Sequence, residues 1–223
     1  MVDNPLGQPL LGSPTIFVDG ELGLPPQGNL PSKCACGTFL VEDPHHFLGC
    51  HKLKPTLTIR HDRLLHLLAR LARMGNITTQ VEVPLDDLKR PDANFFLSSR
   101  TLAIDVSVIH PSAKTYRTAA ARPLGAAAIR EKSKCSAYEE KSRKEDLAFL
   151  PFVMETYGAF GKKASETLAE LAAEASHNGL HQIAGMNFST FAVRALSVCL
   201  QSGNAMALLK GSILSRRAAS GIR

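Results

Sequence analysis

Two acidic residues, one just before a predicted β-hairpin and one within its second strand, are suited to metal chemistry. Asp92 precedes the apolar run at residues 95–97, and Asp105 interrupts residues 102–108, where aliphatic and small or polar residues alternate. The residues at 98–100 favour a turn, so the pattern predicts two strands joined by a tight connection. Folding this hairpin would bring the two carboxylates together. Such a pair favours a divalent cation, Mg²⁺ or Mn²⁺, because hard cations prefer oxygen ligands.

A second group of residues, nearer the N-terminus, has the composition of a zinc site. The predicted ligands are Cys34, Cys36, His45 and Cys50. Three thiolates and an imidazole at these separations can close a tetrahedral site and stabilise a loop too small to have its own core. His46 and His51 are competing ligands, and the spacing excludes neither. We expect a closed structural knuckle, and the alternative is a chance cluster of ordinary reduced cysteines.

The composition is that of a globular chain with one main domain and a small appendage. The chain has 223 residues, of which 44% are hydrophobic and 21% are charged. Its formal net charge of +6 and pI of about 9.2 favour polyanionic partners, with nucleic acid the first candidate. We expect no membrane-spanning segment, because no apolar run approaches about 18 residues. We therefore predict a soluble, intracellular protein.

The elements that must position these residues follow from hydrophobic periodicity. The pattern predicts helices at 59–74, 122–145, 163–176 and 189–209, and strands at 77–83, 95–97, 102–108 and 147–154. Pro151 places the last strand at a sheet edge or a bulge. This order predicts an α/β fold in which a mixed sheet is flanked by helices and carries the acids on its central hairpin. That layout is typical of a metal-dependent nuclease.

The domain organisation predicted from these patterns has four parts. They are an irregular arm or linker at 1–33, the zinc knuckle at 34–54, the nuclease domain at 55–210 and a flexible tail at 211–223. The segment Arg60-His61-Asp62 stands at the start of the first predicted helix. It either caps that helix or lends an acid to a neighbouring metal site, and capping is the favoured interpretation.

Several motifs together resemble a known family. Pro91-Asp92 followed by Asp105 on a hydrophobic strand resembles the PD-(D/E)XK nuclease superfamily, which has the restriction-endonuclease-like fold. With the knuckle, Arg60-His61-Asp62, Lys89-Arg90 and the segment 152–158, the chain is similar to the restriction-like endonuclease domain of site-specific non-LTR retrotransposons. In that family the domain follows the reverse transcriptase. The resemblance covers about residues 22 to 209.

The resemblance implies a role for each matching residue. Asp92, Asp105 and the Val106 carbonyl would ligate Mg²⁺, and the domain would nick target DNA to expose a primer for reverse transcription. The lysine that the superfamily carries two residues after the second acid is replaced by Ser107. Similar retrotransposon domains place this lysine on the following helix, where Lys134 is favoured over Lys132.

The resemblance also implies partners and a compartment. DNA would be the substrate, RNA of the element and an attached or separate reverse transcriptase would be further partners, and the protein would be nuclear. The candidate phosphate contacts are Arg60, Arg63, Lys89, Arg90 and Arg130. A hypothesis from another class is a catalytically silent zinc-knuckle module that binds nucleic acid, for which Ser107 in the lysine position is the best support.

Overall fold

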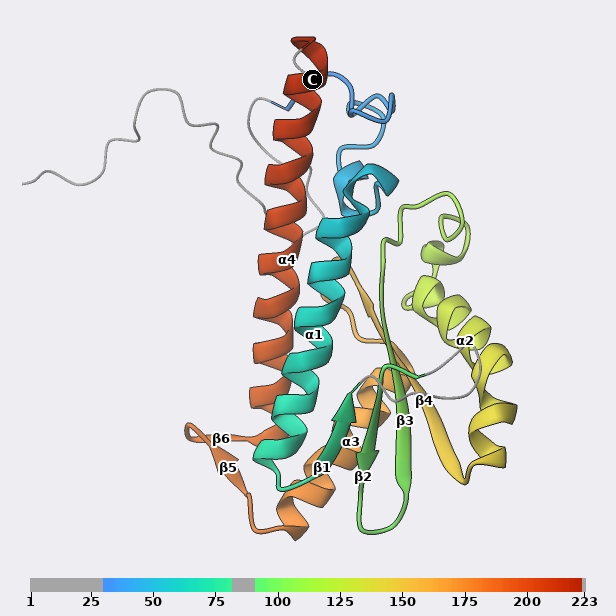
Figure 1. Cartoon of the computed structure of the whole chain (residues 1–223), viewed down its shortest axis with the longest axis vertical. Coiled ribbons are helices and arrows are strands. Elements are labelled where there is room, and N and C mark those ends of the chain that lie inside the picture. Colours follow the sequence, from blue (N-terminus) through green and yellow to red (C-terminus); the bar gives the residue numbers. More distant parts are fainter. Residues whose placement is uncertain (1–29, 82–90, 222–223) are drawn as a thin grey trace, which may run out of the picture.

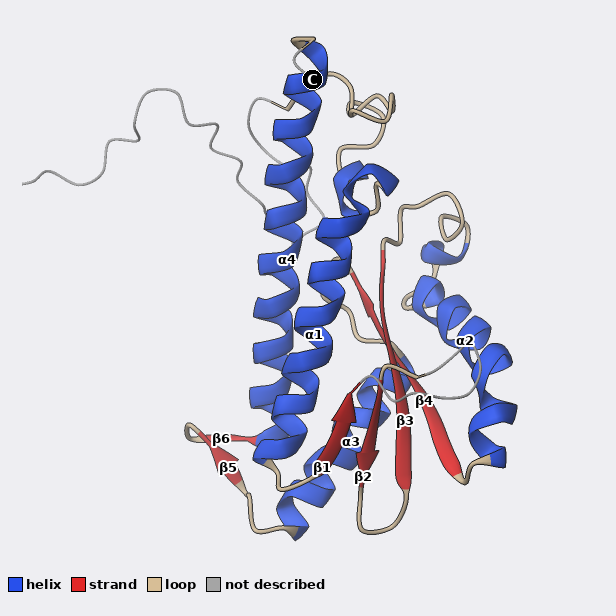
Figure 2. Ribbon diagram, viewed as in Figure 1, coloured by secondary structure: helices blue, strands red, loops and turns tan. Residues whose placement is uncertain are grey.

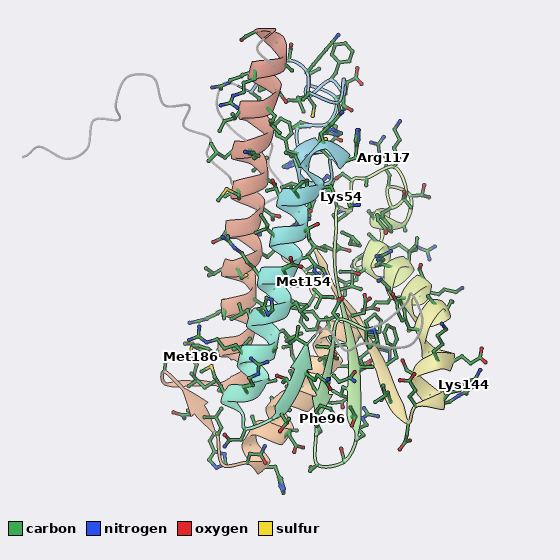
Figure 3. All side chains as sticks on the ribbon, viewed as in Figure 1. Lys54, Phe96, Arg117, Lys144, Met154 and Met186 are labelled. Carbon is green, nitrogen blue, oxygen red and sulfur yellow. The ribbon has the colours of Figure 1, made fainter. Side chains whose placement is uncertain are left out.

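The computed structural model describes residues 30–81 and 91–221 and contains one main sheet with helices on both faces (Figures 1 and 2). The helices are α1 (Lys54–Met74), α2 (Gly125–Lys144), α3 (Lys162–His177) and α4 (Phe188–Ala219). The strands are β1 (Thr78–Val81), β2 (Ala93–Phe96), β3 (Thr101–Ile109), β4 (Leu147–Glu155), β5 (Gln182–Ile183) and β6 (Met186–Asn187). Short 3-10 turns cover His46–Leu48, His51–Leu53 and Ala119–Ala121.

The main sheet is mixed, as the sequence predicts. Its strand order is β1-β2-β3-β4, in which β1 and β2 are antiparallel, β2 and β3 are antiparallel, and β3 and β4 are parallel. The predicted hairpin is confirmed, with Phe96 opposite Thr101 and Ala93 opposite Ile104. The prediction that Pro151 lies at an edge is also confirmed, because β4 is the outer strand; Pro151 pairs with Asp105 in the β3–β4 register.

The unequal lengths of β2 and β3 create an open strand edge. β2 spans 4 residues and β3 spans 9, so the β2–β3 register ends at the pair Ala93–Ile104. At Val106 the side chain of Asp92 takes the place of a neighbouring strand, because its carboxylate accepts the Val106 N–H at 2.7 Å. Beyond Ile104, β3 still pairs with β4, but on its β2 side the described residues that meet its backbone are side chains such as Asp92 and His61.

The two faces of the sheet have different helical cover. Leu102, Ile104 and Val106 of β3 belong to the main core with α1, α3 and α4. Asp105 and Ser107 alternate with them and so point to the opposite face, on which α2 packs. Both are nevertheless buried. A buried carboxylate facing a helix requires a partner on that helix.

Helices α1 and α4 run side by side along one side of the molecule (Figure 1), and Arg60 joins them. Its guanidinium donates to Asn204 Oδ1 at 2.8 Å and to the Leu48 carbonyl at 3.3 Å. The side chain is buried, and burial lowers the pKa of Arg60 to about 10. The prediction that Arg60 contacts phosphate is therefore wrong: this residue is a buried tie between helices.

The C-terminal part of the chain is helical for longer than the pattern predicted. α4 continues to Ala219, so the predicted flexible tail at 211–223 is wrong for residues 211–219. Its apolar spacing persists through Leu208, Gly211 and Ser215, which are buried. By length and composition α4 is also sufficient to cross a membrane, with a hydropathy of 1.2 over its most apolar window, of which 39% is buried. In this structure its inner face packs on the core.

Gly211 of α4 permits close contact with the N-terminal segment. A Cβ at this position would meet the ring of Phe47, which is fully buried. We therefore expect Gly211→Val to lower the free energy of unfolding by about 1–3 kcal/mol through overpacking. Urea denaturation of the variant measures this change. Ser202→Val on the exposed side of the same helix is the control, and equal stability of the two variants would contradict the packing described here.

Candidate metal and nuclease sites

A cluster of four ligand-forming side chains lies at the N-terminal end of the described chain. Its members are Cys34, Cys36, His46 and Cys50, whose ligand atoms lie within 4.8 Å of one another. Cys34 Sγ and Cys50 Sγ are 3.6 Å apart, and Cys36 Sγ is 3.0 Å from His46 Nε2. Three sulfurs and one imidazole nitrogen form the donor set of a structural zinc site. The cluster can hold a metal such as zinc.

The histidine of this cluster is His46, one of the two alternatives that the sequence left open, and not His45. The ring of His45 lies against those of Tyr157 and His110, with centroid separations of 5.3 and 6.2 Å. His46 begins the 3-10 turn and directs Nε2 at Cys36, while its Nδ1 lies 3.3 Å from Asp43 Oδ2. A carboxylate on the second ring nitrogen is the usual way to orient a metal-binding histidine.

The thiols of the cluster have unequal acidity. Burial, together with the neighbouring Cys34, raises the pKa of Cys50 to about 12. Burial also opposes ionisation of Cys36, but hydrogen bonds with Thr38 and neighbouring side chains outweigh it and lower its pKa to about 6. Several thiolates so close together repel one another unless a cation lies among them.

The segment that carries this cluster, which lies within the predicted zinc knuckle at 34–54, rests on α4. The Ala35 N–H donates to Ser215 Oγ at 3.0 Å, and Phe47 and Leu208 belong to one apolar cluster with Cys34 and Cys50. This explains why α4 extends past Leu209. α4 provides an apolar surface on which residues 34–50 pack.

We expect the purified protein to contain one zinc per chain and Cys36→Ser to lose most of it, since three ligands hold zinc less tightly than four. Elemental analysis after gel filtration measures the content. Cys135→Ser, which changes a half-buried thiol of α2 outside the cluster, should retain the metal. A zinc-free wild-type protein, or full occupancy in Cys36→Ser, would show that the cluster is not a zinc site.

A polar cleft of about 400 Å³ lies beside the first residue of β2, Ala93, where β3 continues past the β2–β3 pairing. α1, β3 and α2 supply most of its walls, and Leu48 and Gly49 border it. Its lining residues with polar side chains are Arg60, His61, Asp92, Asp105, Ser107, His110, Arg130 and Lys134. The structure thus brings both predicted acids and the favoured lysine into one cleft.

On the α2 side of the cleft, Lys134 pairs with Asp105. Its Nζ lies 2.8 Å from the carboxylate oxygens, and the Asp105 side chain is only 4% exposed. Burial raises the pKa of Asp105, while the hydrogen bond from Lys134 opposes that rise. Arg130, one helical turn earlier, donates through Nε to Ser107 Oγ at 3.3 Å. Two cations of α2 therefore face the second acid.

The α1 side of the cleft contains Asp92 and His61. His61 Nε2 lies 3.2 Å from Asp92 Oδ2 and 3.1 Å from the Val106 carbonyl oxygen, and His61 Nδ1 lies 3.0 Å from Asp62 Oδ1. Hydrogen bonding to Asp92 raises the pKa of His61 to about 9, although burial opposes this rise. His61 Nε2 thus lies within hydrogen-bond distance of both Asp92 and the Val106 carbonyl.

The other predicted site residues do not join this group. Lys132 is exposed, and its backbone carbonyl accepts a hydrogen bond from Ser136 Oγ. Arg63 is exposed on α1, and Lys89 and Arg90 lie outside the described residues. Arg130 is half-buried at the cleft and is the predicted phosphate contact best placed for that role.

Two histidines of the cleft were not predicted as site residues. α1 begins at Lys54, so the segment 60–62 lies in its second turn and does not cap it; the capping interpretation is wrong, and His61 rather than an acid faces the site. His110 follows β3 directly, and its Nδ1 is 2.9 Å from Thr156 Oγ1. Burial lowers the pKa of His110 to about 4. The sequence signal that could have identified His110 as a site residue is its position immediately after an apolar strand.

Neither a protein-family model nor a curated protein matches this chain. Its function must therefore be inferred from the residues of the cleft and of the zinc knuckle.

Proposed function

We propose that this protein is a metal-dependent DNA endonuclease that hydrolyses phosphodiester bonds. The observation that supports the proposal most is the meeting of Asp92, Asp105 and Lys134 in one polar cleft. Two acids and a positive charge around an accessible space are the groups that phosphodiester hydrolysis needs. Lys134 supplies the positive charge that is missing at Ser107.

The donor atoms of the cleft fit a hard divalent cation. Asp92 presents carboxylate oxygens, the Val106 carbonyl lies beyond the last described β2–β3 pair and faces His61, and Asp105 adds a second carboxylate. We propose that these groups hold Mg²⁺ or Mn²⁺, which prefer such oxygen ligands. The bound cation would activate water and neutralise charge on the scissile phosphate.

The remaining side chains have roles that follow from their positions. Lys134 stabilises the negative charge that develops on the phosphate, and its contact with Asp105 keeps its ammonium in place. Arg130 contacts a phosphate oxygen at the mouth of the cleft and is oriented by Ser107. The buried position of Asp105 excludes water from one side of the carboxylate, which strengthens its interaction with Lys134.

The biological setting is proposed from the motif resemblance. We infer a DNA-nicking domain of a site-specific non-LTR retrotransposon, acting in the nucleus on target DNA, with element RNA and a reverse transcriptase as partners. The zinc knuckle lies beside the cleft through Leu48 and Gly49, which line it. A nucleic acid in the cleft would therefore pass close to the knuckle.

The test is a labelled DNA duplex incubated with the protein and Mn²⁺ or Mg²⁺. Cleavage should leave a 3′-hydroxyl that a DNA polymerase extends, since a primer is what reverse transcription requires. Salt-sensitive binding of the intact duplex with no cleavage in either metal would instead favour the silent nucleic-acid-binding module. Failure to bind any DNA or RNA would contradict both.

A further inference from the structure

His61 is placed at the proposed cation site by α1, although the oxygen-only ligand set gives it no role. Its Nε2 faces two oxygens at once, 3.2 Å from Asp92 Oδ2 and 3.1 Å from the Val106 carbonyl. Asp92 Oδ2 also accepts the Val106 N–H at 2.7 Å, so the two oxygens lie at the same point of the β3 edge. An imidazole nitrogen that faces two oxygens either donates a shared proton to them or accompanies them around a cation.

His61 Nε2 stands from each of the two oxygens at about the spacing of neighbouring ligands on one metal ion. In an octahedral site with bonds of about 2.1 Å, adjacent ligand atoms stand about 3 Å apart. The two separations from His61 Nε2 come close to that value. A small contraction of side chains would therefore suffice to place one cation in contact with all three.

The other ring nitrogen has the partner expected for a metal-binding histidine. His61 Nδ1 lies 3.0 Å from Asp62 Oδ1, from the next residue of the same helix. Donation of the Nδ1 proton to a carboxylate leaves the Nε2 lone pair free and fixes the ring orientation. The cluster at the zinc knuckle shows the same arrangement, in which His46 has Asp43 on Nδ1 and Cys36 on Nε2.

We propose that His61 is a direct ligand of the catalytic cation through Nε2, beside Asp92 and the Val106 carbonyl. This inference rests on the proposed function, for which it selects one of the two proposed metal ions. Mg²⁺ prefers oxygen donors and holds its hydrating waters tightly, whereas transition metals accept imidazole nitrogen. The site should therefore bind Mn²⁺ more tightly than Mg²⁺. Asp62 is the residue that positions His61.

Binding of Mn²⁺ to the zinc-loaded full chain tests this assignment without any cleavage assay. Electron paramagnetic resonance counts bound Mn²⁺, and electron spin-echo modulation detects a nitrogen nucleus bonded to it. We expect a nitrogen coupling in the wild type that disappears in His61→Asn, with Mn²⁺ affinity at least about 10-fold weaker in both His61→Asn and Asp62→Asn. His66→Asn, an exposed histidine further along α1, is the matched control and should leave both readouts unchanged.

Two results would overturn the inference. One is bound Mn²⁺ with no nitrogen coupling that depends on His61. The other is equal or tighter Mn²⁺ binding in His61→Asn, which would make His61 a competitor for the cation position. Neither result requires DNA cleavage to fail. Conversely, a wild type that shows the His61-dependent coupling but cleaves no DNA would support the ligand assignment and contradict the proposed nuclease function.

Discussion

Plasmid nicking is expected to fall by at least about 1,000-fold in Asp105→Asn, a loss of about 4 kcal/mol of transition-state stabilisation. The amide has almost the same shape as the carboxylate but lacks the charge. It therefore weakens cation binding and removes the ionic partner that orients Lys134 at 2.8 Å. Asp92→Asn should have an effect of similar size, because Asp92 joins the proposed cation site to the Val106 backbone. Single-turnover conversion of supercoiled to relaxed plasmid measures both.

Folding of these two variants must be established separately, because Asp105 is buried against α2. Circular dichroism and zinc content provide this control, since the zinc knuckle does not include either acid. Nicking that survives in both folded variants would show that the chemistry takes place elsewhere. Loss of nicking together with loss of zinc would instead report unfolding, and the variants would then be compared under conditions in which they are folded.

The second large effect is expected at Lys134. Removal of its ammonium in Lys134→Ala should slow nicking about 100- to 1,000-fold, the range found when one preorganised transition-state donor is deleted. Lys132→Ala should stay within about 2-fold of the wild type, because Lys132 is exposed and makes no contact with Asp105 among the described residues. The two variants each remove one positive charge from α2. A loss of DNA affinity that depends on net charge alone would therefore be the same in both.

The same assay, at saturating protein concentration, separates catalysis from binding. Equal losses in Lys134→Ala and Lys132→Ala would indicate that the two lysines act only through net charge. A larger loss in Lys132→Ala would reverse the assignment. Partial recovery in Lys134→Arg is expected, since the cation is retained but its geometry differs from that of an ammonium.

Much of this site was predictable because its residues are close in the sequence or follow a strict period. The hairpin that unites Asp92 and Asp105 has an alternating strand and a short turn, which determine its register. Lys134 required more than spacing, since only the packing of α2 on the sheet decides that it rather than Lys132 reaches the acid. The resemblance named both lysines and favoured Lys134, and the packing of α2 places Lys134 beside Asp105.

The incorrect predictions concern choices made by tertiary packing. Arg60 has the charge of a phosphate contact, but the approach of α4 at Gly203 leaves it buried beside Asn204. His45 and His46 are adjacent in sequence, and only the direction of a 3-10 turn decides which one faces Cys36. The pattern predicts a flexible tail because of its charges, whereas α4 continues there and residues 35, 47 and 50 pack against it. No local pattern contains these contacts.

The most direct measurement is the conversion of supercoiled plasmid to relaxed circles by the zinc-loaded wild-type chain. Nicking is predicted to require Mn²⁺ or Mg²⁺, to proceed through Asp92, Asp105 and Lys134, and to stop on chelation of the added metal. Relaxed circles that increase with time and are religated by DNA ligase would agree with this account. A folded wild-type protein with Mn²⁺ bound in the cleft that leaves the plasmid supercoiled would contradict it.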